Sequence, residues 1–265
     1  MVQLTELAQS PVKHICVYGA PKSGKTELAG KLSEKFNLVW FDLEKGSATL
    51  HKLPAEWKQR INVIQIPDTR VNPQAIDTVL KVMKGLPVEI CIKHGKVSCP
   101  ICRKEGAVSE RVSLNDLGPN DCVVIDSGTQ LTNSAIAHIT RDKDELYKLQ
   151  HDDWGNLGKL MDTILSYIQA APYNVVWITH ENEVKVPDGS KEGKDKLVPT
   201  AGTRNFSRNS AKYFDEVVYC EIKNKQHRFA SSTTYANGIL TGGRSSANLD
   251  NNPNAKLLDL WETPQ

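Results

Sequence analysis

The sequence predicts an α/β protein with a mostly parallel, twisted sheet, and three observations favour this class. Apolar, β-prone runs alternate with segments of helical spacing, which is typical of a parallel sheet covered by helices on both faces. The first run leads directly into a glycine-rich segment, residues 19–26. The 265 residues are 39% hydrophobic and 24% charged, an ordinary globular composition. We therefore expect one domain over residues 1–265, with a short inserted segment at 86–112.

The predicted strands are short apolar runs that end in polar residues or in proline. They are residues 14–18, 38–42, 62–66, 122–126 and 174–180, followed by two alternating strands, 216–222 and 227–234, that we expect nearer an edge and antiparallel. The predicted helices repeat apolar side chains at i, i+3 and i+4, and they are residues 26–36, 73–84 and 152–171. The polar stretch 187–208 has no clear period, so we expect a loop there.

The segment between the first strand and the first helix is a complete G-x-x-x-x-G-K-[ST] phosphate-binding loop. It consists of Gly19, Ala20, Pro21, Lys22, Ser23, Gly24, Lys25 and Thr26. The strand before it and the helix after it are the context that distinguishes this motif from a chance turn. We expect the backbone N–H groups to surround nucleotide phosphates, Lys25 to reach the β- and γ-phosphates, and Thr26 to bind Mg²⁺. ATP and Mg²⁺ are the predicted ligands.

Three further residues follow apolar strands and so meet at the same edge of a parallel sheet. Asp126 ends the run 123–125 and is the predicted second Mg²⁺ residue; the alternative is an ordinary Asp turn. Glu44 is the candidate for orienting the attacking water; the alternative is a solvated surface glutamate beside Lys45. His180 ends the next strand and is a candidate for sensing the γ-phosphate or the metal, or else a structural histidine.

A cluster of soft metal ligands lies in the inserted segment. Cys91, His94, Cys99 and Cys102 occupy twelve residues, and two short-spaced pairs are what a tetrahedral Zn²⁺ site needs. Reduced thiols and a redox pair, Cys99 with Cys102, are the alternatives. We expect a zinc knuckle that staples the insertion, and its basic neighbours leave a contact with DNA or a partner open.

Charge and hydropathy indicate which partners and which cellular location to expect. The formal net charge is only +2, so a nucleic-acid surface requires local clustering. Basic residues cluster after the strand that ends in His180, where they either contact phosphates or form a solvated loop: Lys185, Lys191, Lys194, Lys196, Arg204, Arg208 and Lys212. The N-terminus is unlike a signal peptide and no apolar run approaches a membrane span. We therefore expect a cytoplasmic protein, in the host cytoplasm if it is phage-encoded.

The order of these motifs resembles the RecA-type recombinase core, and more closely the compact phage-encoded RecA-like ATPases that act in single-strand annealing or recombination. The resemblance rests on the phosphate loop and on residues 40–44, 123–127 and 176–180. It implies that Glu44 activates water and that the basic loop binds DNA, while RecA has glutamine where this chain has His180. It also implies ATP sites between subunits, completed by a neighbour's basic residues: Lys223 and Lys225, with Arg244 as a rival.

The sequence is thus interpreted as a RecA-like ATPase that binds single-stranded DNA and assembles into a filament or ring, with a single-strand DNA-binding protein as a further candidate partner. One rival hypothesis is a nucleotide-switched module that loads or recruits a replication or repair partner. A P-loop kinase of a small molecule is another. The basic, glycine-rich loop and the cysteine cluster favour the first reading over a kinase, which usually needs an arginine-rich lid.

Overall fold

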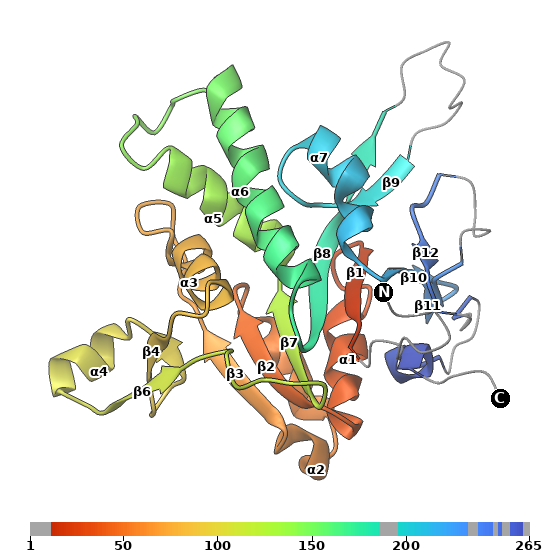
Figure 1. Cartoon of the computed structure of the whole chain (residues 1–265), viewed down its shortest axis with the longest axis horizontal. Coiled ribbons are helices and arrows are strands. Elements are labelled where there is room, and N and C mark those ends of the chain that lie inside the picture. Colours follow the sequence, from red (N-terminus) through yellow and green to blue (C-terminus); the bar gives the residue numbers. More distant parts are fainter. Residues whose placement is uncertain (1–11, 186–195, 233–237, 246–248, 251–254, 262–265) are drawn as a thin grey trace, which may run out of the picture.

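One sheet forms the centre of the computed structural model, which describes residues 12–185, 196–232, 238–245, 249–250 and 255–261. The strand order is β11-β10-β1-β8-β7-β2-β3-β5-β4-β6 (Figure 1). The core strands are β1 His14–Gly19, β2 Asn37–Asp42, β3 Ile61–Gln65, β7 Asp121–Asp126, β8 Asn174–Val184 and β10 Glu216–Lys223. All neighbours among these core strands pair in parallel. The predicted mostly parallel sheet is therefore confirmed.

The remaining elements surround or extend this sheet. The helices are α1 Lys25–Gly30, α2 Ala55–Lys58, α3 Gln74–Met83, α4 Pro100–Glu105, α5 Gly128–Ile139, α6 His151–Gln169 and α7 Arg204–Asn209. The other strands are β4 Val88–Cys91, β5 Lys96–Val97, β6 Ser109–Val112, β9 Lys196–Pro199, β11 Gln226–Ala230 and β12 Gly242–Gly243. Among the described helices, none is both long and apolar enough to cross a membrane.

Two apolar layers hold the helices on opposite faces of the sheet, because successive side chains of a strand point to opposite faces. In β1, Cys16 and Tyr18 join the layer that contains the buried stripes of α3, α5 and α6. Ile15 and Val17 join the layer on the α1 side. The expectation of helices on both faces is confirmed, and α6 buries the stripe that its spacing predicts.

Three local predictions differ from the structure. The helix predicted at 26–36 is α-helical only as far as Gly30, and a 3₁₀ helix follows over Lys31–Glu34. The stretch expected to be a loop contains β9 and α7 in its described part, because β9 pairs with β8 and Thr203 caps α7 through its side chain. The strand at 216–222 is parallel to its inner neighbour β1, and its antiparallel partners are the outer strands β11 and β12.

The segment with the cysteines projects from the body of the molecule beside β3 (Figure 1). Its three short strands continue the main sheet: β5 pairs in parallel with β3, and β4 pairs antiparallel with both β5 and β6. The short helix α4 joins β5 to β6. The segment therefore adds an outer extension to one edge of the sheet.

Candidate nucleotide-binding site

The carboxyl ends of β1, β2, β7 and β8 meet at one edge of the sheet, where open α/β sheets bind ligands. A cleft of about 470 Å³ lies at this edge, and the phosphate loop, Glu44, Asp126 and His180 all line it. The register explains the convergence, since Gly19 pairs with His180 and Asp42 pairs with Asp126. Residues far apart in sequence are thus brought together as the strand ends predict.

Lys25 is the buried cation of the phosphate loop, with only 6% of its surface exposed. Its ammonium group donates hydrogen bonds to the carbonyl oxygens of Gly19 at 2.9 Å and Ala20 at 2.7 Å. Burial lowers the pKa of Lys25, because desolvation disfavours the charged amine. An anion bound in the loop would pair with the ammonium group and favour its charged form, so the loop fits a polyphosphate.

Gly24 and His227 are in close contact at the entrance of the first helix. Gly24 has a φ of +96°, and a Cβ atom on it would lie 2.7 Å from Nδ1 of His227. The same Nδ1 lies 2.9 Å from the carbonyl oxygen of Ser23. Glycine is therefore required here both by the backbone conformation and by the imidazole that lies against the loop.

Thr26 and Asp126 form the pair expected to hold magnesium. The Thr26 hydroxyl donates to Oδ2 of Asp126 at 3.0 Å. Burial raises the pKa of Asp126 to about 7, and the nearby carboxylates of Glu44 and Asp42 act in the same direction. A hydroxyl and a carboxylate are oxygen ligands of the kind that Mg²⁺ prefers, and a cation would relieve the penalty on the buried carboxylate. The donor set therefore fits the ion.

Glu44 follows β2 on the solvent-exposed rim of the cleft. Its Oε1 accepts a hydrogen bond from the Ser127 hydroxyl, and Ser127 also caps α5 by accepting from the N–H of Gln130 at 3.2 Å. Asp42, two residues earlier, accepts from the N–H of Gly46 at 2.9 Å and so fixes the turn that follows. The carboxylate of Glu44 is thus oriented toward the Asp126 side of the cleft.

His180 is half-buried at the end of the central part of β8. Burial lowers the pKa of its imidazole, and the nearby Lys25 charge adds to this effect. Its backbone N–H donates to Oγ1 of Thr129 at 2.9 Å, and its carbonyl oxygen accepts from the N–H of Thr200 at 2.9 Å. His180 therefore connects the cleft to the chain that leads into α7.

The candidate residues for a neighbour's site lie at two different edges. Lys223 ends β10, and Lys225 lies in the tight turn between β10 and β11. Lys225 also lines a second cleft that contains Gly24 and Glu27 of the same chain. Arg244 lies at the opposite edge, where its Nη1 pairs with Oδ1 of Asp215 at 2.9 Å. The hairpin is therefore beside its own phosphate loop, and Arg244 is remote from it.

The basic residues after His180 are spread over several elements. Lys185 follows β8, Lys196 begins β9, Arg204 and Arg208 lie one turn apart on α7, and Lys212 lies over the ring of Tyr213 at 4.7 Å. Lys191 and Lys194 fall outside the described residues. Phe206 on α7 is partly buried and packs on Tyr213 with ring centroids 6.1 Å apart, so this ring packs against the core.

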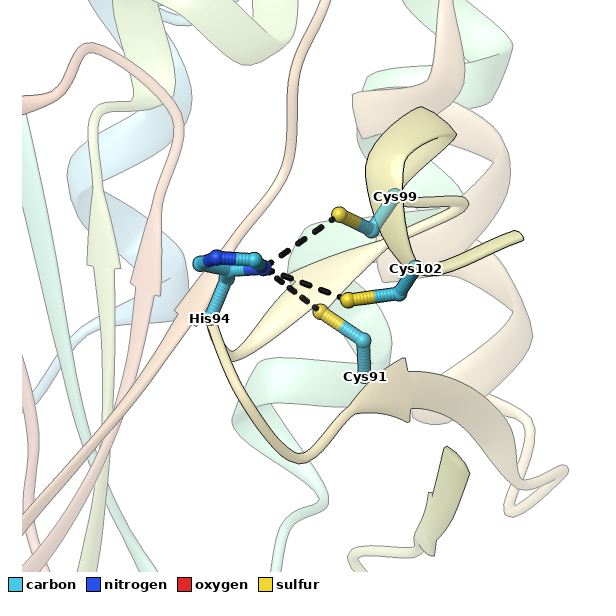
Figure 2. A group of neighbouring side chains, drawn as sticks. All are labelled: Cys91, His94, Cys99 and Cys102. Atoms are coloured by element: carbon cyan, nitrogen blue, oxygen red, sulfur yellow. Dashed lines mark hydrogen bonds between the residues drawn. The ribbon is translucent and has the colours of Figure 1, made fainter. Parts of the chain in front are cut away.

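The four predicted zinc ligands converge in the projecting segment (Figure 2). Their ligand atoms all lie within 4.8 Å of one another, and the three cysteines are buried while His94 is half-buried. This Cys₃His set is consistent with Zn²⁺.

The sequence did not identify several residues that line the nucleotide cleft, among them Ser127 and His227. Ser127 has a local signal, since Ser127 and Gln130 form an S-x-x-Q capping pattern directly after a strand. His227 has none, because it reaches the loop from 204 residues away. Only the pairing of β10 with β1 brings it there.

A family model described as AAA domain matches residues 12–255, and no curated protein matches. Similar solved structures include the RadB recombinase (14% identity, 82% of this chain, 79% of that chain, TM-score 0.41). They also include an ATPase from the type III secretion system of pathogenic bacteria (14% identity, 79% of this chain, 52% of that chain, TM-score 0.43). A third is a KaiC-like protein from Pyrococcus horikoshii OT3 (13% identity, 82% of this chain, 76% of that chain, TM-score 0.37).

The family match covers the phosphate loop, every core strand and the carboxyl-edge cleft. Together with the strand order, it confirms the RecA-like α/β fold that the sequence predicts. The chain belongs to the AAA domain family of P-loop ATPases.

Proposed function

We propose that this protein is a Mg²⁺-dependent ATPase that binds single-stranded DNA and acts in recombination or single-strand annealing of the phage type. In this proposal the protein works as a filament or ring with ATP sites between subunits, and a single-strand DNA-binding protein is a further candidate partner. The observation that carries the proposal is the hydrogen-bonded connection between the nucleotide cleft and the basic helix α7.

The nucleotide half of the proposal rests on residues with distinct tasks. Lys25 holds the β- and γ-phosphates, and Thr26 and Asp126 hold the metal, which when bound neutralises charge on the phosphate oxygens. Glu44 orients the attacking water and accepts its proton. Its Oε1 accepts a hydrogen bond from the Ser127 hydroxyl, so this contact must loosen or share the carboxylate when water binds.

The DNA half rests on a continuous set of hydrogen bonds. Oγ1 of Thr129 accepts a hydrogen bond from the N–H of His180 and lies 3.0 Å from Oγ1 of Thr179. The Thr179 hydroxyl in turn donates to the carbonyl oxygen of Thr200 at 2.8 Å. Next to Thr200, the N–H of Ala201 donates to the Ser207 hydroxyl on α7 at 2.9 Å. A nucleotide that moves His180 would thereby displace α7 and its arginines.

The small number of phosphate contacts that one subunit offers supports the proposed assembly. One α7 helix and its neighbours offer few cations, so a single subunit should bind DNA weakly and in a salt-sensitive way. Several subunits on one strand raise the effective concentration and bind far more tightly. Lys223, Lys225 and Arg244 are the proposed contributors to a neighbour's nucleotide site, and Arg244 suits this role best because it faces away from its own cleft.

The test is a measurement of mass in solution with an ATP analogue and a long single-stranded oligonucleotide. The proposal predicts cooperative, nucleotide-favoured assembly that increased salt weakens. A strict monomer that ignores the DNA would contradict both the recombination role and the roles of the three residues in a neighbour's site.

The rival function is a nucleotide-switched module that loads or recruits a partner and turns over slowly. The contact of Glu44 with Ser127 favours it, because Oε1 of Glu44 is then engaged with a hydroxyl group and not with a water molecule. ATP binding that proceeds with negligible hydrolysis under all DNA conditions would support this rival. Hydrolysis that requires a small hydroxyl compound would instead support a P-loop kinase.

A further inference from the structure

The three sulfurs of the cysteine cluster face one nitrogen atom (Figure 2). Nδ1 of His94 lies 3.2 Å from the sulfur of Cys102, 3.6 Å from that of Cys99 and 3.9 Å from that of Cys91 (Figure 2). A ring nitrogen takes part in one hydrogen bond, as donor or acceptor. Hydrogen bonding therefore does not account for three sulfurs at similar distances from it.

A central zinc ion accounts for these separations. With Zn–S near 2.3 Å and Zn–N near 2.0–2.1 Å at tetrahedral angles, nitrogen and sulfur ligands lie about 3.6 Å apart. The three observed separations lie on both sides of this value. A redox pair would use two sulfurs and leave the third sulfur and the imidazole without a purpose, whereas zinc uses all four groups.

The helix α4 is attached to the molecule mainly through this cluster. Its one buried residue is Cys102, while Ile101 beside it is 53% exposed. Cys91, Cys99 and Cys102 form a small buried cluster separate from the two main layers. The ion pair of Lys93 with Glu105 is exposed on both sides, so it contributes little. Packing alone therefore provides little to hold α4 against β4.

The turn that carries His94 lies directly on the edge of the core sheet. The carbonyl oxygen of Gly95 accepts from the N–H of Gln65 in β3 at 2.8 Å. Gly95 has a φ of +60°, and a Cβ atom there would lie 2.7 Å from the carbonyl oxygen of Val63. The backbone of the turn thus covers the edge of β3. Without this cover, the backbone N–H and C=O groups at that edge would be unpaired and able to bind strands of other chains.

We infer that Cys91, His94, Cys99 and Cys102 bind one Zn²⁺ ion, and that this ion holds the extension β5-β4-β6 over the edge of β3. The metal thereby stabilises the outer sheet and protects its edge, without taking part in nucleotide chemistry. Because the ligating thiols are deprotonated, zinc binding releases protons and weakens at acidic pH.

The first experiment measures metal content by elemental analysis of protein purified without chelator. We expect about one Zn²⁺ per chain, and Co²⁺ exchanged into the site should give the sulfur-to-cobalt charge-transfer and d–d absorption of a tetrahedral thiolate site. Cys102→Ser should lose the zinc, whereas Cys122→Ala, a buried cysteine in β7 away from the cluster, should keep it. Protein without zinc, or Cys102→Ser protein that retains it, would overturn the site.

The second experiment tests the role of the ion by hydrogen exchange. Removal of zinc from the wild-type protein should accelerate exchange about tenfold or more in residues 88–112 and in β3, and zinc added back should restore protection. Exchange in β1 and β8 should stay unchanged. Unaltered protection of β3 after zinc removal would contradict the edge-holding role. The comparison uses wild-type protein throughout, so it stands even if Cys102→Ser does not fold.

Discussion

Replacement of Asp126 by asparagine should stabilise the nucleotide-free protein while it abolishes hydrolysis. The side chain is 4% exposed, and its carboxylate is ionised at a cost because burial raises its pKa to about 7. Asparagine has the same shape and keeps an oxygen to accept from Thr26. The variant therefore removes a buried charge without removing the hydrogen bond at 3.0 Å.

The magnitude follows from the pKa shift. A carboxyl group with a pKa of about 7 in the folded protein and an ordinary value of 3.8 is harder to ionise when folded, so its contribution to stability falls as the pH rises through that interval. At 1.36 kcal/mol per pH unit, the penalty reaches about 4 kcal/mol at pH 8. At pH 5 the same arithmetic gives about 2 kcal/mol.

The assay is denaturant unfolding at pH 5 and pH 8 in magnesium-free buffer without chelator, so that the cysteine cluster is undisturbed. Asp126→Asn should exceed the wild type in stability, and by more at pH 8 than at pH 5. Asp152→Asn, whose side chain is 98% exposed, is the control and should change stability by less than about 0.5 kcal/mol at either pH. A variant no more stable than the wild type at pH 8, or a difference independent of pH, would refute the reasoning.

Three further predictions concern function. Lys25→Ala should lower hydrolysis about a hundredfold or more, because the cation at the β- and γ-phosphates is lost; near-wild-type turnover would exclude that role. Glu44→Gln should bind ATP with unchanged affinity and lose turnover, as measured by ligand titration and phosphate release, and a wild-type rate would show that Glu44 does not activate water. Arg204→Ala with Arg208→Ala should weaken single-stranded DNA binding and flatten its salt dependence while basal hydrolysis continues; unchanged DNA affinity would remove α7 from the interface.

The phosphate loop and the core strands were predictable because their signals are local. Residues 19–26 contain the whole motif, and each apolar run identifies a strand without knowledge of its neighbours. Asp126 and Glu44 were predictable with one further assumption, that parallel strands end at one edge. The register of β2 with β7 satisfies it.

The remaining features depend on tertiary pairing. His227 meets Ser23 across 204 residues, and nothing near it in sequence signals that contact. The alternation within 216–222 favours an antiparallel strand near an edge. The strand β10 is second from the edge, but it pairs in parallel with β1, and residues 216–220 are buried while only its last residues reach solvent. Helix α7 has a single capping threonine, Thr203, as its local signal, and that signal is weak in a stretch rich in polar residues.

The rate of ATP hydrolysis in the presence of Mg²⁺, with and without single-stranded DNA, decides whether this protein is a DNA-stimulated ATPase. We expect hydrolysis that requires Mg²⁺, is lost in Lys25→Ala, and rises strongly when single-stranded DNA is added, with duplex DNA much less effective. A rate that is indifferent to single-stranded DNA, in a protein that hydrolyses ATP normally, would exclude the proposed coupling between the nucleotide site and DNA.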